Sequence, residues 1–368
     1  MTWRTTRRWA AVAAFNLAAI ALVLGAAEVG VRLTSGADRT DQDDQLPMCR
    51  ADPLTVWRYK PDVRLTYRAP EFEMQVRTNE EGLRSAATSA GPGPTVLFIG
   101  DSFTFGWGVS EAERYTDAIG RQLGGVRTVN AGHWMYTFDQ QLLLMRQLIE
   151  RHRPAVVVQG FYWMHVRSLF NHQLERNADG TLRAVLDPKI HVDPRGVLKF
   201  RSDWLERPPL GSQLVALVAR AVLNRDLRER AADWVDYMRP GSTRDAALWA
   251  ETDALIGETA RLLRAAGIAY VPFLIPASVE VGGTQWSHVG WMGSTPPPGI
   301  DVTLPATRFA AMLRRHGAEP VELAAALREQ GGAALYFPQD GHWNAAGHAA
   351  AGRLLEPAVR RALSRAGN

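Results

Sequence analysis

The chain has 368 residues, of which 46% are hydrophobic and 22% charged, so it can bury the core of one large domain or two small ones and is not a disordered chain. Its formal net charge is +4, but the arginines are spread along the chain rather than gathered in blocks with aromatic residues, which argues against nucleic-acid binding. The single cysteine, Cys49, excludes an intrachain disulfide, a cysteine-based zinc site and a CxxC redox motif.

An apolar run near the amino terminus predicts a membrane anchor. Arg4, Arg7 and Arg8 precede it, so we assign 1–8 as a cytoplasmic N-terminus and 9–29 as a transmembrane signal-anchor. A helix of roughly 20 residues crosses a bilayer core of about 30 Å. Positive charge before the run predicts a single-pass protein of a bacterial inner membrane, with the rest of the chain periplasmic. The alternative is a cleaved signal peptide, whose apolar region would be unusually long.

Residues 30–90 predict a linker and a small β element. The stretch 34–46 is polar and acidic, which is typical of a solvated linker. Residues 57–84 then alternate between apolar and polar side chains and end in a turn at 79–82. We interpret this element as a spacer that orients the following domain above the lipid.

From 91 to 368 strands alternate with helices, which predicts the α/β fold class, with a parallel sheet covered by helices on both faces. The predicted strands are Val96–Ile99, Val126–Asn130, Ala155–Trp163, Ala269–Ile275 and Pro320–Leu323. The predicted helices are one containing Tyr115, Ile119 and Leu123 after a Ser110/Glu113 capping box, then Thr137–Arg151, Ala246–Ala266, Ala306–Arg315 and Asn344–Leu363. The stretch 168–245, with one predicted helix at Leu214–Leu223, is interpreted as an insertion that covers the domain.

Three loops leave strand ends, where sites of open parallel sheets collect. Ser102 follows the first strand at the point where it turns into a helix, and Gly132 follows the second. The third loop, just before the final helix, carries Asp340 and His342. Because a serine is a poor nucleophile at neutral pH, it needs an imidazole to take its proton and a carboxylate to orient that imidazole. These three side chains predict a Ser102–His342–Asp340 catalytic triad.

The motifs that hold these residues resemble those of the SGNH/GDSL hydrolase superfamily. They are GDSF after a strand, NAG after the next strand and DGHWNAAGH before the terminal helix, and the similarity covers about residues 94–365. The resemblance implies a three-layer α/β/α fold with a flavodoxin-like sheet, preceded here by the transmembrane helix and the small β element. It also implies Ser102 as nucleophile, His342 as base, Asp340 as acid, and the backbone N–H groups of Ser102 and Gly132 as oxyanion donors.

Two departures from the family pattern stand out. The third block normally contributes an Asn side chain to the oxyanion hole, but residues 160–165 contain no Asn, and the loss of one such donor costs on the order of 10² to 10³ in rate. One residue separates Asp340 from His342 where commoner members have two. This shorter form is similar to that of membrane-linked SGNH proteins that acetylate or deacetylate bacterial exopolysaccharides.

Other residues near the motifs are candidates for the wall of a substrate cleft. They are His133, Trp163, His165 and Trp343, for each of which packing in the core is the alternative. The nine histidines show no metal-ligand spacing, and the glycines form neither a phosphate loop nor a dinucleotide fingerprint, so we expect no metal and no cofactor.

Together these features predict a membrane-anchored serine esterase that removes an acyl group, most simply acetyl, from a cell-envelope glycan or a similar carbohydrate. The alternatives are an O-acyltransferase on exopolysaccharide that uses the same site, and a glycan-binding or assembly component without turnover. The expected partners are an acylated carbohydrate or other ester and, through one helix, the membrane, with no nucleic acid. The acyl group, its acceptor and the oligomeric state are not encoded in any recognisable motif.

Overall fold

The computed structural model describes residues 3–35, 47–85, 93–166, 173–176, 182–185, 191–192, 196, 198–199, 212, 214–215, 217–218, 236–243, 246–283 and 298–366. The chain divides into two compact units. One comprises Met1–Gln45 and Phe200–Leu227, and the other comprises Leu46–Lys199 and Arg228–Asn368. Part of the predicted insertion at 168–245 therefore groups with the amino-terminal unit.

The larger unit is built on a five-stranded parallel sheet with the strand order β13-β12-β7-β5-β6. Of these five strands, the second in chain order (β6) lies at one edge beside the first (β5), and the other three follow on the other side of β5. This is the flavodoxin-like order. The strands are β5 (Thr95–Gly100), β6 (Arg127–Gly132), β7 (Val156–Phe161), β12 (Ala269–Leu274) and β13 (Val321–Glu322). Every residue of β5 and β7 is buried, as expected for strands covered on both faces.

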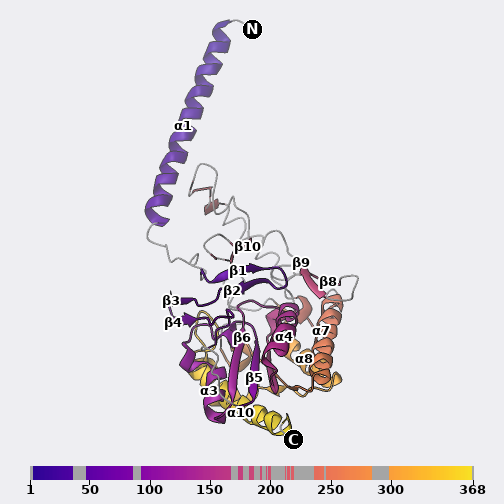
Figure 1. Cartoon of the computed structure of the whole chain (residues 1–368). Helices are drawn as coiled ribbons and strands as arrows, with labels where there is room; N and C mark the ends of the chain where they lie inside the picture. The colour runs from indigo at the N-terminus through magenta and orange to yellow at the C-terminus, as the bar shows by residue number, and fades with distance from the viewer. Residues whose placement is uncertain are drawn as a thin grey trace. The chain divides into compact units, whose positions relative to one another are not determined.

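Helices cover both faces of this sheet (Figure 1). Helices α3 (Tyr115–Leu123) and α10 (Ala345–Ala366) pack together on one face. Helices α4 (Phe138–His152), α7 (Ala246–Ala265) and α8 (Leu304–Arg315) form the layer on the other face. The predicted three-layer α/β/α fold is confirmed.

Short helical segments lie between the main elements, and their bounds were not predicted. They are α2 (Ser102–Phe105), α9 (Ala324–Gln330), and the 3-10 turns η1 (Glu111–Glu113), η2 (Trp163–His165), η4 (Asp236–Met238), η5 (Ser278–Val281) and η7 (Gly332–Leu335). The Ser110/Glu113 pattern begins η1, with the Ser110 backbone N–H donating to Glu113, and not the longer helix α3. The reason is that Arg114 is extended and separates the two segments.

The predicted small β element consists of two antiparallel hairpins. Strands β1 (Cys49–Asp52) and β2 (Val56–Tyr59) form one, and β3 (Arg64–Ala69) and β4 (Phe72–Arg77) form the other. The turn at 79–82 is also present, since the Asn79 side chain accepts backbone N–H groups across it. Two further pairs of strands lie in the predicted insertion: β8 (Gln173–Arg176) with β9 (Leu182–Val185), and β10 (His191–Val192) with β11 (Leu198–Lys199).

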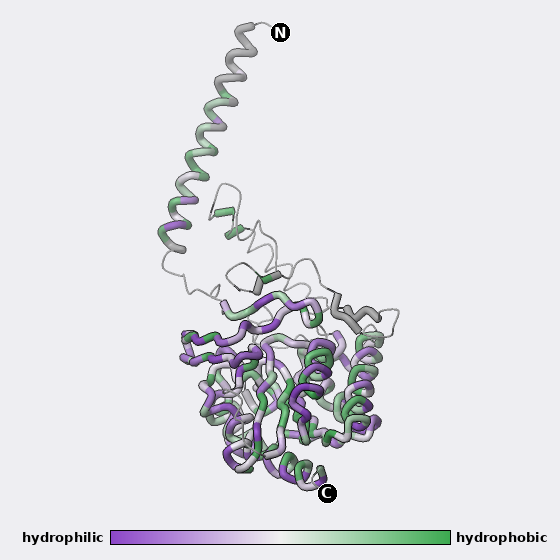
Figure 2. Tube along the Cα trace, in the orientation of Figure 1, coloured by the Kyte–Doolittle hydropathy of each residue, from purple (hydrophilic) through white to green (hydrophobic). Residues whose placement is uncertain are grey.

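The amino-terminal unit contains helix α1 (Trp3–Ser35). Its stretch Ala14–Leu33 is long and apolar enough to cross a membrane, a test that a signal sequence also passes. Figure 2 shows these hydrophobic residues along α1, with hydrophilic ones near its carboxyl end. Most of the predicted linker at 34–46 lies outside the described residues. So does the predicted helix Leu214–Leu223, except for positions 214–215 and 217–218, which are helical.

Candidate active site

The serine predicted as nucleophile lies in a tight turn between strand and helix. Strand β5 ends at Gly100, and the Asp101 carboxylate caps α2 by accepting the Phe103 backbone N–H at 3.0 Å. Ser102 is the first residue of α2, so its own N–H has no acceptor within the helix. Gly100 is required here, because a Cβ atom would lie 2.2 Å from the Thr104 hydroxyl oxygen. The turn therefore presents a hydroxyl and a free helix-start amide at the carboxyl end of the sheet.

The structure brings Ser102, His342 and Asp340 into one hydrogen-bonded chain. The Asp340 carboxylate accepts the Nδ1 proton of His342 at 2.6 Å, so Nε2 is the unprotonated nitrogen of the neutral ring. In this tautomer Nε2, which lies 2.7 Å from Ser102 Oγ, can accept a hydrogen bond from the serine hydroxyl group. Ser102 and His342 are each 3% exposed, and the side chain of Asp340 is 24% exposed. This arrangement meets the requirements of general-base activation of a serine.

The carboxylate of Asp340 is fixed by two further donors. The His342 backbone N–H donates to Oδ1 at 3.1 Å, and the Trp107 indole N–H donates to Oδ2 at 3.0 Å. Both carboxylate oxygens are therefore occupied, and the ring of His342 packs against Phe103 with centroids 4.8 Å apart. These contacts hold the imidazole in one orientation.

Gly132, predicted as an oxyanion donor, has its N–H committed elsewhere in this structure. It donates to the side-chain oxygen of Asn130 at 2.9 Å, while the Asn130 amide group donates to the carbonyl of Thr104. A Cβ atom at position 132 would lie 2.1 Å from the backbone nitrogen of Phe105. The glycine is thus required so that β6 and α2 can approach each other.

Two buried arginines support the segment that follows the serine. The Arg84 guanidinium donates to the carbonyl oxygens of Phe105, Gly106, Val109 and Gln75, and it lies over the Phe105 ring. Arg114 donates to the backbone carbonyl of Arg84 and pairs with a neighbouring carboxylate. Burial, followed by the nearby Arg114 cation, lowers the pKa of Arg84 to about 9. The cation is retained by carbonyl oxygens, which stabilise the loop in return.

Three of the four predicted cleft-lining residues, His133, Trp163 and Trp343, are buried in the core. The imidazole of His133 is sandwiched between the rings of Tyr59 and Tyr136, each with centroids 4.4 Å away, and burial lowers its pKa to about 3. Trp343 is fully buried against Phe103. The other two lie in η2, where the Trp163 side chain is buried and the His165 side chain lies outside the described residues. His133, Trp163 and Trp343 therefore offer no open surface to a substrate. The sequence places these residues near the motifs but carries no signal for the direction of their side chains.

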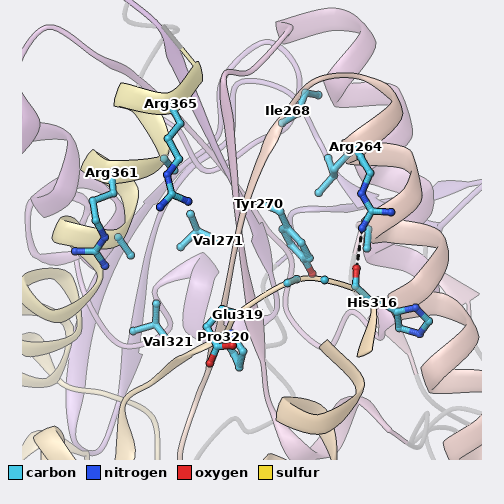
Figure 3. A pocket seen from close by; sticks show the side chains of 16 residues that line it. Arg264, Ile268, Tyr270, Val271, His316, Glu319, Pro320, Val321, Arg361 and Arg365 are labelled. Atoms are coloured by element: carbon cyan, nitrogen blue, oxygen red, sulfur yellow. Dashed lines mark hydrogen bonds between the residues drawn. The ribbon is translucent and has the colours of Figure 1, made fainter. Parts of the chain in front are cut away.

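A pocket of about 700 Å³ lies at the opposite end of the sheet, at the amino ends of β12 and β13 (Figure 3). Arg264 of α7 and Arg361 and Arg365 of α10 line it, and Arg264 donates to the carbonyl of His316 at 2.9 Å. Ser102 and its hydrogen-bonded partners do not line this pocket. We therefore place the candidate site at the hydrogen-bonded triad.

Among the residues that the structure describes, no group of three or more His, Cys, Asp or Glu side chains is placed to hold a metal ion. The remaining histidine of the motif, His348, is buried on α10. Its Nδ1 lies 3.4 Å from the Tyr115 backbone nitrogen, and burial lowers its pKa to about 3.

The serine turn and the histidine–aspartate loop meet at the carboxyl end of a flavodoxin-like sheet, the arrangement that the resemblance to SGNH hydrolases implies. The family described as "SGNH hydrolase-like domain, acetyltransferase AlgX" matches residues 233–367, a range that includes Asp340 and His342. Residues 233–367 therefore match an SGNH hydrolase-like domain, which confirms the predicted resemblance.

Several solved structures are similar to this chain at low identity. TesA is 12% identical, with 73% of this chain and 99% of that chain covered and a TM-score of 0.40. The lipase/acylhydrolase from Enterococcus faecalis is 12% identical, with 73% and 96% covered and a TM-score of 0.38. The acetyl xylan esterase AlAXEase is 12% identical, with 72% and 99% covered and a TM-score of 0.38. No protein among the curated sequences matches the chain.

Sequence reasoning missed residues that support the triad from a distance. Glu71 and Arg84 come from the small β element, and their type and spacing carry no motif. Trp107 lies four residues after the end of the GDSF segment, in the turn that follows α2. Its nearness to Ser102 in the sequence was the one available signal.

Proposed function

We propose that this protein cleaves or transfers an ester-linked acyl group by way of an acyl-serine intermediate. The observation that carries the proposal is the hydrogen-bonded chain from Asp340 through His342 to Ser102. Nucleophilic attack begins from a neutral imidazole that accepts a hydrogen bond from the serine hydroxyl group.

The proposed reaction has two halves. Ser102 Oγ attacks the ester carbonyl carbon as its proton moves to His342 Nε2, and Asp340 stabilises the imidazolium that forms. When the tetrahedral intermediate collapses, the carbon–oxygen bond to the leaving alcohol breaks, and that alcohol takes the proton from Nε2. Water or a sugar hydroxyl then attacks the acyl-serine carbonyl and gives its proton to His342 Nε2. The bond between Ser102 Oγ and the acyl carbon breaks, Oγ takes the proton back from Nε2, and the acyl group leaves as an acid or a new ester.

The proposed oxyanion donor is the N–H of Ser102 at the start of α2. The N–H of Gly132 would serve as a second donor only by exchanging its present acceptor, Asn130, for the oxyanion. Residues 162–166, which follow β7 directly, contain neither Asn nor Gln and so supply no side-chain amide to the oxyanion. We therefore expect a modest rate for a member of this class.

We propose an acylated carbohydrate of the cell envelope as the substrate, with the protein held at a bacterial inner membrane by α1 and its catalytic unit in the periplasm. The match to a family whose description names an acetyltransferase supports acetyl as the acyl group. The same match favours a second candidate, transfer of the acyl group to a sugar hydroxyl instead of water.

The test uses the full chain in detergent with p-nitrophenyl acetate and a fluorophosphonate probe. We expect burst kinetics and labelling of Ser102, and a loss of about 10⁴-fold or more in kcat for Ser102→Ala. Ser110→Ala, a serine on the same loop system but outside the triad, is the matched control and should keep its activity.

Adding a glycan acceptor separates the two enzymatic candidates, because a transferase delivers acyl groups to the glycan in competition with water. Absence of turnover together with absence of labelling would contradict the proposal and favour a glycan-binding component.

A further inference from the structure

The hairpin β3–β4, interpreted from the sequence as a spacer, reaches the loop that carries Asp340 and His342. Pro70 and Glu71 form the two-residue turn of this hairpin. One carboxylate oxygen of Glu71 accepts the Asp340 backbone N–H at 2.7 Å. The carboxylate also accepts the Gln339 backbone N–H, at 3.0 and 3.1 Å from its two oxygens. A single side chain from outside the sheet therefore binds two successive amides of the loop.

The hairpin is itself held in place by contacts between β4 and other parts of the chain. Arg84 donates to the carbonyl of Gln75 on β4 at 2.7 Å. Met74 is fully buried, with its sulfur 3.3 Å from the Gly108 backbone nitrogen. A side chain at the tip of such an anchored hairpin positions its partner, because the hairpin cannot follow a displaced loop without breaking these contacts.

The hairpin also touches the second support of Asp340. The ring of Trp107, whose N–H binds Asp340, has its centroid 5.2 Å from that of Tyr67 and 6.1 Å from that of Phe72. Phe72 further packs on Phe337, just before the loop, with centroids 4.9 Å apart. The hairpin thus contacts both the backbone amide of Asp340 and the indole that binds its carboxylate.

We infer that Glu71 is a positioning residue for the acid–base loop, an inference that rests on the proposed function of Ser102, His342 and Asp340. By fixing the Asp340 backbone, Glu71 sets the direction of the carboxylate and, through it, of the His342 imidazole toward Ser102. The hairpin is therefore a part of the active site and not only a spacer.

The test compares substitutions at Glu71 with a matched control on the same hairpin. Glu73 has the same charge two positions away, is exposed and pairs with Arg68 at 2.8 Å. We expect Glu71→Ala to lower kcat about 10- to 100-fold with a smaller change in KM, because a displaced imidazole misaligns proton transfer. Glu71→Gln should lie between wild type and Glu71→Ala, since its one amide oxygen still accepts an N–H. Glu73→Gln should stay near wild type.

The pH profile adds a readout that a merely structural contact would not move. A displaced Asp340 carboxylate stabilises the protonated imidazole less well, so the acidic limb of kcat/KM should move to lower pH in Glu71→Gln and far less in Glu73→Gln. A kcat and a pH profile for Glu71→Gln that match those of Glu73→Gln would overturn the inference.

A measurement without turnover keeps the two proposals distinguishable. The Nδ1 proton of His342, hydrogen-bonded to Asp340, is expected as a low-field proton resonance that Asp340→Ala abolishes. If Glu71→Gln broadens or shifts this resonance and Glu73→Gln does not, Glu71 positions the loop even where the wild-type chain shows no esterase activity. An unchanged resonance would contradict the positioning role.

Discussion

The two ends of the central sheet differ in how they hold their polar groups. At the carboxyl end, Ser102 and His342 are buried and hydrogen-bonded to each other and to Asp340. At the amino end, Arg361 and Arg365 are exposed around a pocket of about 700 Å³. These arginines lie in the last turns of α10, where a cation complements the helix dipole.

The comparison shows that a large volume lined by charge does not by itself identify a reactive site. The carboxyl end differs because its polar side chains are buried and form one chain of hydrogen bonds from Ser102 through His342 to Asp340. Burial makes each of these hydrogen bonds stronger and each misplaced group more costly. The experiments below measure how far that difference extends beyond the triad.

The largest effect is expected from the buried arginine that supports the serine loop. Arg84→Met removes the guanidinium that donates to four carbonyl oxygens and should destabilise the fold by about 3–5 kcal/mol. Arg84→Lys should lose less, because an ammonium group supplies three donors. The matched control at the amino end, Arg361→Met, should change stability by about 0.5 kcal/mol or less. Thermal unfolding of the full chain measures all three, and equal losses at Arg84 and Arg361 would contradict the contrast between the two ends.

The next effect concerns the approach of β6 to α2. In Gly132→Ala the new Cβ would lie 2.1 Å from the Phe105 backbone nitrogen, so the strand end and the serine helix must separate. We expect a loss of about 2–3 kcal/mol in stability together with lower esterase activity. Gly352→Ala on α10 is the control, because its Cβ has an ordinary contact distance of 3.4 Å and alanine favours a helix by about 1 kcal/mol. Tolerance of alanine at position 132 would show that the glycine is not required for close packing.

The smallest effect is a pH dependence of stability at Glu280, in the turn after β12. Burial raises the pKa of this carboxyl to about 7, although the Ala277 N–H donates to it. The folded state keeps its proton to a higher pH than the unfolded state does, so wild-type stability falls as the pH rises from about 4.5 to 7. Glu280→Gln removes this loss and should gain up to about 2–3 kcal/mol over wild type at pH 8 relative to pH 4.

Glu319→Gln tests whether this behaviour is confined to the carboxyl end. Glu319 is exposed at the rim of the amino-end pocket and pairs with Arg314. Its substitution should show little change of stability between the two pH values, as measured by thermal unfolding. A pH-dependent gain at Glu319 equal to that at Glu280 would remove the distinction.

The sheet and the motif loops could be predicted because their signals are local. Val96–Ile99 is an apolar run that ends in glycine and serine, and Asp340 and His342 are separated by one residue, so few positions determine each feature. The same locality explains why α4, α7, α8 and α10 were predicted nearly at their observed bounds.

What could not be predicted depends on contacts between distant parts of the chain. Glu71 and Arg84 act through backbone amides and carbonyls, which leave no mark on the residue type of their partners. Trp343 lies in a motif yet is directed into the core, where its ring packs against Phe103 and Tyr115. For Gly132, the motif predicted an amide donor, whereas the structure accounts for the glycine by the close approach of Phe105.

Glu71 and Gln339 are separated by 268 positions, and Ser102 and His342 by 240. Both connections therefore join an early part of the polypeptide to its last loop. A chain interrupted during synthesis before position 339 would possess the serine turn and most of the sheet but would lack the proposed base and its carboxylate. The proposed chemistry thus becomes possible only near the end of synthesis of the chain, after nearly every other element has been made.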